Sequence, residues 1–123
     1  MTKILLVEDI PDNAELVRKA LSGRDYEIIH APDAETGLSL ALEYIPDLIL
    51  LDLGLPDYDG QTLAGWLRAE PVLDSTRIVA FTAWPEETAK AMVESYGFDG
   101  YICKPIGRVS DFLAKINSYL RAP

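Results

Sequence analysis

The chain has 123 residues, of which 49% are hydrophobic and 25% are charged, and its formal net charge is −9 at pH 7. This length and composition predict one domain with a packed core rather than a disordered chain. The negative charge argues against a protein that binds nucleic acid or an anionic membrane, because both need a cationic surface. It favours a positively charged partner or a cation such as Mg²⁺.

The cysteine count and the apolar runs narrow the class of protein further. The one cysteine, Cys103, excludes an internal disulfide and a cysteine-based zinc cluster. The longest apolar runs are too short for a signal peptide or a membrane span. We therefore expect a cytoplasmic protein.

Short apolar runs alternate with amphipathic segments along the whole chain. Strands are expected at residues 4–7, 28–31, 48–51, 78–81 and 101–103. The runs are mostly unalternated, as is typical of strands buried on both faces. The segments between them carry apolar residues at helical spacing; Pro11 is typical of a first helical turn and Gly97 of a helix end. The pattern predicts an α/β fold, a doubly wound five-stranded parallel sheet with helices on both faces.

Polar residues follow four of the five expected strands. Glu8 and Asp9 follow the first strand, Asp52 the third, Thr82 the fourth and Lys104 the fifth. Sites in open α/β sheets lie outside the carboxyl ends of the strands, so these side chains are expected to meet. Each also has an ordinary interpretation as a helix cap, a turn cap or a solvated lysine.

The chemistry of this set limits what the site does. Three clustered carboxylates repel one another unless a proton or a cation intervenes, and Lys104 supplies only one positive charge. Mg²⁺ can balance the remaining negative charge, because it is a hard ion that prefers carboxylate oxygens, water and phosphate. A metal, an acid nucleophile, a lysine and a hydroxyl together indicate phosphoryl transfer onto Asp52.

Four stretches resemble the receiver domain of bacterial two-component response regulators. They are "ILLVEDIPDN" (4–13), "DLILLDLGLPDYDG" (47–60), "IVAFTA" (78–83) and "GFDGYICKPI" (97–106), and the resemblance covers nearly the whole chain. It implies the flavodoxin-like receiver fold with strand order 2-1-3-4-5. It also implies a single receiver domain over residues 1–123, with no output domain in this chain, that catalyses only its own phosphorylation and dephosphorylation.

The resemblance also implies roles for individual residues. Asp52 matches the phosphoacceptor, which takes a phosphoryl group from the phosphohistidine of a histidine kinase or a histidine phosphotransfer protein. Glu8 and Asp9 match the acidic pair that holds Mg²⁺ together with Asp52, and Gly54 sits where a backbone carbonyl joins the metal. Lys104 matches the lysine that pairs with the phosphoryl group.

Further positions belong to the implied switch. Thr82 matches the hydroxyl that follows the phosphoryl group, and Tyr101 falls where an aromatic side chain changes rotamer on activation. The surface of the fourth helix, fifth strand and fifth helix would then change shape, toward an unknown downstream protein or a homodimer. Pro105 falls where the family commonly has a cis peptide bond. Trp84 either shields the acyl phosphate and lengthens its life, or serves in partner contact or loop packing.

Two other functions compete with this interpretation. A pseudo-receiver would bind partners without being phosphorylated, but the set of acids, threonine and lysine is complete. A small Mg²⁺-dependent aspartyl-phosphate hydrolase usually has a second aspartate two residues after the nucleophile, where this chain has Gly54. It would also need a cap domain, for which the chain has no room. A nucleotide-binding motif is not present.

Two polar residues receive no functional role from the sequence. His30, the only histidine, is expected to be a strand residue near the sheet edge. Asp57 is expected in a solvated turn, where it could add to the field of the metal site. Whether the chain works alone, as a phosphorelay intermediate or as a receiver from a larger protein stays open.

Overall fold

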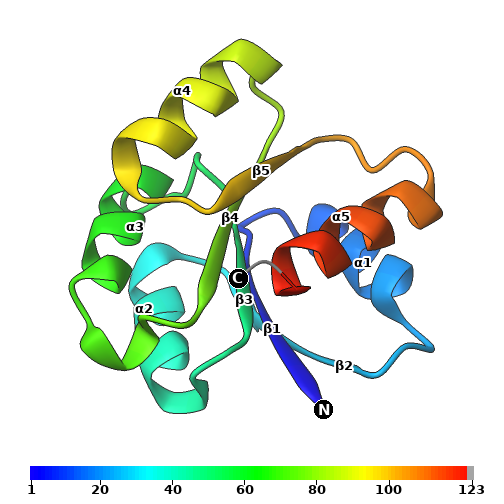
Figure 1. The fold of residues 1–123 in the computed structure, drawn as a ribbon, viewed down its shortest axis with the longest axis horizontal. Coiled ribbons are helices and arrows are strands. Elements are labelled where there is room, and N and C mark those ends of the chain that lie inside the picture. Colours follow the sequence, from blue (N-terminus) through cyan, green and yellow to red (C-terminus); the bar gives the residue numbers. More distant parts are fainter. Residues whose placement is uncertain (122–123) are drawn as a thin grey trace.

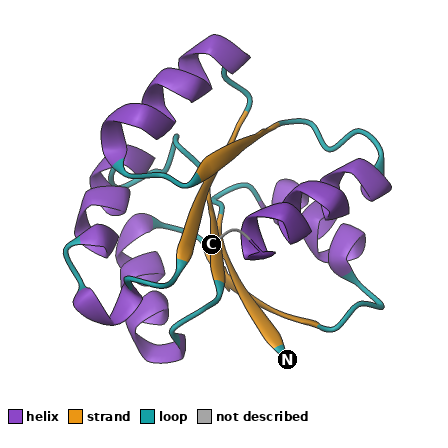
Figure 2. Cartoon of the chain, in the orientation of Figure 1, coloured by secondary structure: helices purple, strands orange, loops and turns teal. Residues whose placement is uncertain are grey.

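The computed structural model describes residues 1–121, in which strands and helices alternate along the chain (Figures 1 and 2). All five expected strands are confirmed; β3 matches the predicted run, and the other four extend theirs by one or two residues at an end. The elements are β1 Thr2–Val7, α1 Pro11–Leu21, β2 Tyr26–Ala31, α2 Ala34–Tyr44, β3 Leu48–Leu51, α3 Gly60–Arg68, the short 3₁₀ helix η1 Pro71–Leu73, β4 Arg77–Thr82, α4 Glu86–Tyr96, β5 Gly100–Cys103 and α5 Val109–Arg121.

The five strands form one parallel sheet in the order β2-β1-β3-β4-β5, which confirms the doubly wound, flavodoxin-like fold. The strand order reverses at β1, whose neighbours are β2 and β3. Val7 lies opposite Leu51 in the register of β1 and β3. The residues that follow these two strands, Glu8 and Asp52, therefore leave the sheet side by side at its carboxyl edge.

Helices cover both faces of the sheet. In Figure 1, α2, α3 and α4 lie on one side of the strands and α1 and α5 on the other. Successive strand residues serve opposite cores: Leu5 and Val7 pack with α2 and α3, whereas Ile4 and Leu6 pack with α1 and α5. Every residue of β3 is buried, because this central strand is covered on both faces. Among residues 1–121, no helix combines the length and the apolar character that a bilayer crossing requires.

Local sequence signals set the helix ends near the site. Pro11 opens α1, and Gly97 ends α4 with a φ of 82°, a left-handed backbone that glycine adopts without strain. Asp33 and Asp59 are the N-caps of α2 and α3, and each side chain accepts a hydrogen bond from the amide three residues further on. The two acidic caps fix where the loops at the carboxyl edge give way to helix.

The outer edge of β5 is covered by α5. The Tyr119 hydroxyl accepts a hydrogen bond from the Tyr101 amide and donates one to the Tyr101 carbonyl, both at 3.1 Å. A side chain at Gly100 would prevent this contact, because a Cβ there would lie 2.1 Å from the Tyr119 ring. Gly100 thus lets the ring approach the strand.

Candidate metal and phosphoryl-acceptor site

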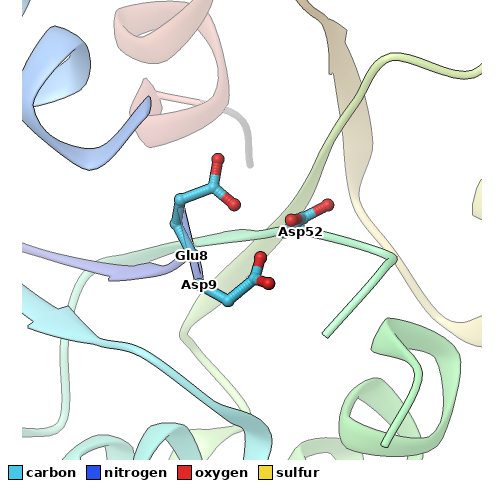
Figure 3. A group of neighbouring side chains, drawn as sticks. All are labelled: Glu8, Asp9 and Asp52. Carbon is cyan, nitrogen blue, oxygen red and sulfur yellow. The ribbon is translucent and has the colours of Figure 1, made fainter. Parts of the chain in front are cut away.

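The carboxyl edge of the sheet gathers three carboxylates around one space. Glu8 and Asp9 follow β1, Asp52 follows β3, and one oxygen of each carboxylate lies within 4.8 Å of the others (Figure 3). Lys104, which follows β5, extends its Nζ to within 2.7 Å of Glu8 Oε1 and 3.6 Å of Asp52 Oδ2. The structure therefore brings together the acids and the lysine that the sequence placed at separate strand ends.

Two oxygens of this acidic cluster are buried without a hydrogen-bond partner. They are Glu8 Oε2 and Asp9 Oδ1, and the Glu8 side chain is completely buried. A buried carboxylate oxygen without a donor or a cation is costly, so each such atom requires an explanation. A hard divalent cation satisfies oxygen atoms in this arrangement, and the donor set is the one that Mg²⁺ prefers. The residues present therefore fit a magnesium ion.

The pKa of Asp52 lies above its ordinary value. Burial and the neighbouring Glu8 carboxyl raise the pKa of Asp52 to about 6, while Lys104 and the Gly54 amide act in the opposite direction. That amide donates to Asp52 Oδ1 at 3.2 Å. Desolvation disfavours the charged form of a carboxyl group, and a nearby cation favours it. A cation bound beside Asp52 would thus promote the ionised carboxylate.

Lys104 is held by contacts of its backbone and of its side chain. Its amide donates to the Thr82 carbonyl at 2.7 Å, and its Nζ lies 5.1 Å from the centre of the Phe81 ring. The peptide bond to Pro105 is cis. The side chain is largely buried and bonds Glu8, so it is not the freely solvated lysine of the ordinary interpretation. Its ammonium group faces the same space as Asp52.

Thr82 ends β4 as a buried residue. Its Oγ1 accepts a hydrogen bond from the Trp84 amide at 3.0 Å, and the N-cap of α4 is Pro85, so Thr82 does not cap that helix. Trp84 is 36% exposed. Thr82 is thus a hydroxyl on the strand between those that present Asp52 and Lys104.

Tyr101 lies on β5 and is bonded to α4. Its hydroxyl donates to Glu86 Oε1 at 2.7 Å. This hydrogen bond, together with burial and the charge of Glu86, raises the pKa of Tyr101 to about 12. In this conformation the phenol joins the start of α4 to the strand, so any change of its rotamer must break a contact between β5 and α4.

The loop from β3 to α3 is fixed by contacts that the sequence did not reveal. Asp57 Oδ1 accepts from the Ala34 amide at 2.9 Å and Oδ2 from the Glu35 amide at 3.0 Å. Although burial opposes it, these amides hold the pKa of Asp57 below its ordinary value. Asp57 therefore lies exposed in the turn, as expected, and its carboxylate also joins the loop to the start of α2. No local pattern predicts this, because the partners are more than 20 residues away in sequence.

Gly60 allows the same loop to turn tightly past Asp52. A Cβ at Gly60 would lie 2.7 Å from the Asp52 carbonyl oxygen, closer than such contacts occur. Gly54, on the other side of the loop, pairs with Asp59 in an isolated antiparallel bridge. The loop that carries the Gly54 carbonyl is thus restrained at both ends.

Comparison with known proteins shows the family of the chain. The model of the response regulator receiver domain matches residues 4–117. The chain belongs to this family. Receiver domains are signalling modules of two-component systems rather than metabolic enzymes, and they interact with histidine kinases and downstream targets.

This receiver domain resembles its relatives over almost its full length. It is 36% identical over 121 residues to the polar-differentiation response regulator DivK of Brucella ovis, and the match covers 98% of each chain. The crystal structure of a putative response regulator from Chloroflexus aurantiacus has a TM-score of 0.91 at 27% identity, again covering 98% of both chains.

A second solved structure is that of another receiver domain with a bound metal. The receiver domain of the sensor histidine kinase PA1611 from Pseudomonas aeruginosa has a TM-score of 0.88 at 25% identity, and 98% of each chain is covered. That receiver domain has a magnesium ion coordinated in its active-site cleft.

Proposed function

We propose that this receiver domain accepts a phosphoryl group on Asp52, in a Mg²⁺-dependent transfer from the phosphohistidine of a histidine kinase or a histidine phosphotransfer protein. The observation that supports this most directly is the position of the Asp52 carboxylate. It lies within 4.8 Å of oxygens of Glu8 and Asp9 and 3.6 Å from the Lys104 ammonium. These are the charges that phosphoryl transfer onto a carboxylate requires.

The residues that would hold the metal are Asp9, Asp52 and the Gly54 carbonyl, with Glu8 acting through water. The orphaned oxygens of Glu8 and Asp9, and the magnesium in the receiver domain of PA1611, support this assignment. Bound Mg²⁺ supplies positive charge for the oxygens of the phosphoryl group and for the Asp52 carboxylate.

The chain's own groups perform the transfer. One Asp52 oxygen forms the bond to phosphorus while the phosphorus–nitrogen bond of the donor breaks, and its electron pair leaves with the imidazole. Lys104, held 2.7 Å from Glu8, offsets charge on the phosphoryl oxygens. Because the carboxylate is the nucleophile, protonation of Asp52 opposes the reaction, and the burial that raises its pKa makes neutralisation by cations necessary.

The acyl phosphate would then act as a switch through Thr82 and Tyr101. Thr82 has a hydroxyl hydrogen to donate to a phosphoryl oxygen, since its Oγ1 accepts from Trp84 here. Tyr101 must leave Glu86 to fill space behind Thr82. Reversing a 1:99 equilibrium requires about 5.5 kcal/mol. Two charge-assisted hydrogen bonds, from Thr82 and Lys104, supply about 3–6 kcal/mol, which is close to sufficient.

The proposed output is a change in the surface formed by α4, β5 and α5. A downstream protein, or a second copy of this receiver domain, would recognise that surface in the phosphorylated state. Tyr101 supports this, because its hydroxyl joins β5 to α4 through Glu86. The cytoplasm, where two-component partners meet, is the proposed place of action.

Trp84 is proposed to shield the acyl phosphate from water. It follows Thr82 by two residues, and its amide is already bonded to the Thr82 hydroxyl. We expect Trp84→Ala to shorten the half-life of the phosphorylated protein, whereas Trp84→Phe retains most of it. Equal dephosphorylation rates in the wild type and Trp84→Ala would assign this tryptophan to partner contact or loop packing instead.

The deciding experiment is the intact mass after incubation with a small acyl-phosphate donor, with and without Mg²⁺. We expect a gain of one phosphoryl group that requires Mg²⁺ and that Asp52→Asn does not show. If the folded wild type gains nothing, the trial is repeated with a phosphorylated histidine donor. Failure with both donors would overturn the proposal in favour of a pseudo-receiver.

A further inference from the structure

His30 contacts the acidic pair, although the proposed reaction does not use it. It lies on β2 opposite Leu6 of β1, and its Nε2 is 2.8 Å from the Glu8 backbone carbonyl oxygen. A carbonyl oxygen only accepts hydrogen bonds, so Nε2 must carry the hydrogen. The side chain of a residue on the outer strand thus reaches the backbone of the candidate metal site.

The carbonyl that His30 bonds lies just beyond the backbone ladders of the sheet. The Glu8 amide donates to the Ala31 carbonyl at 3.0 Å, and the Asp52 amide donates to the Val7 carbonyl at 3.0 Å. Those two bonds are the last at this end of β1. Within residues 1–121, no backbone amide bonds the Glu8 carbonyl, and His30 is its hydrogen-bond partner.

This carbonyl has a special place because its peptide unit joins Glu8 to Asp9. The peptide unit is planar, so a hydrogen bond that fixes the oxygen also fixes the plane and the direction in which the Asp9 Cα leaves it. The Asp9 carboxylate has a buried oxygen without a partner and faces Asp52 across the site. The orientation of this one peptide therefore sets where a ligand oxygen stands.

We propose that His30 is a positioning residue of the cation site: its hydrogen bond to the Glu8 carbonyl holds the peptide that carries Asp9 and thereby increases the affinity for Mg²⁺. The inference rests on the proposed function for the identity of the ion. It concerns binding of the metal rather than the chemical step, so the two are measured separately. Removing a group that hydrogen-bonds to a metal ligand and orients it commonly lowers the metal affinity.

The test compares Mg²⁺ binding by the whole chain in three variants, using calorimetric titration with Mg²⁺ alone. We expect His30→Leu to weaken Mg²⁺ binding about three- to tenfold, the range that one net hydrogen bond supports. His30→Gln should recover most of the affinity, since its amide can donate from a similar position. Tyr26→Phe is the matched control, because it removes the hydrogen bond to Asn117 at the opposite end of the same strand.

The Mg²⁺ dependence of the phosphorylation rate supplies a second measurement, and a merely structural role of His30 would change it in a different way. With a small acyl-phosphate donor, His30→Leu should need more Mg²⁺ for half-maximal rate, yet reach the wild-type rate at saturating Mg²⁺. A reduced rate at saturation, with unchanged Mg²⁺ demand, would contradict a role in positioning the cation site.

The binding titration decides the inference by itself. Equal Mg²⁺ affinity in the wild type and His30→Leu would overturn it, and so would an equal loss in Tyr26→Phe, which would indicate a general effect of destabilising β2. If the wild type binds no Mg²⁺, the inference falls with the cation site. If the wild type binds Mg²⁺ but gains no phosphoryl group from either donor, the proposed function fails while the positioning role is still judged by the titration.

Discussion

Replacing Asp52 with asparagine should stabilise this receiver domain at neutral pH when Mg²⁺ is removed. The ordinary pKa of the group is 3.8, and in the folded protein it is about 6, chiefly because of burial and the Glu8 carboxyl. Each tenfold change in an ionisation constant corresponds to about 1.4 kcal/mol, so the ionised Asp52 opposes folding by up to about 3 kcal/mol. Partial solvent contact reduces this, and we expect Asp52→Asn to gain about 1–3 kcal/mol at pH 7.

The dependence on pH follows from the direction of the shift. Below pH 3.8 the aspartate is protonated in both the folded and unfolded states, so the two proteins should be similarly stable. Between pH 3.8 and about 6 the unfolded chain loses its proton first, and the wild type is destabilised as the pH rises. The asparagine retains an oxygen that can accept from the Gly54 amide, so that contact is preserved.

Urea unfolding at pH 4 and pH 7, each with EDTA and with Mg²⁺, measures the effect. The advantage of Asp52→Asn should be small at pH 4 and full at pH 7 in EDTA, and Mg²⁺ should reduce it by stabilising the wild type more than the variant. A variant that is less stable than the wild type at pH 7 in EDTA, or equally changed at both pH values, would refute the reasoning.

Three further substitutions test separate contacts. Lys104→Met leaves the fully buried Glu8 carboxylate without its cation, so we expect a loss of about 3–5 kcal/mol in the free energy of unfolding, measured in urea with EDTA. A loss below about 1 kcal/mol would contradict the dependence of Glu8 on the Lys104 ammonium. Asp57→Ala should lower the thermal midpoint above pH 4, and the difference from wild type should shrink as acid protonates the carboxyl group, whose pKa is lowered in the fold. A difference that does not vary with pH would contradict this. Gly60→Ala should destabilise by about 1–3 kcal/mol, because its Cβ meets the Asp52 carbonyl oxygen; a neutral result in thermal melts would mean that the loop relaxes.

Much of this molecule could be predicted from local sequence. The strands were predictable because β3 and its neighbours are buried on both faces and read as continuous apolar runs. The convergence of Asp9, Asp52 and Lys104 followed from topology alone, since parallel strands place their carboxyl ends at one edge. Pro11 and Gly97 marked helix ends because each has a backbone preference of its own.

The contacts of Asp57 and His30 could not be predicted in this way. Asp57 bonds amides of α2, and His30 bonds a carbonyl that follows β1, so each interaction depends on the register between segments more than 20 residues apart. Neither residue type specifies a partner, because a carboxylate or an imidazole is also commonly found exposed to solvent. The hydrogen bonds by which these two residues contact the site can be identified only from the three-dimensional structure.

The Tyr119 hydroxyl that covers β5 also limits how this receiver domain can associate with other proteins. An edge strand normally offers free amides and carbonyls on which a foreign strand can continue the sheet. Here the outward amide and carbonyl of Tyr101 are both occupied by one phenol from α5, and Gly100 keeps room for its ring. A strand that approaches this edge therefore meets occupied main-chain groups at Tyr101, which opposes extension of the ladder there and favours recognition through side chains. Contacts made through side chains can be remodelled by small movements, which suits an interface that has to form and release repeatedly.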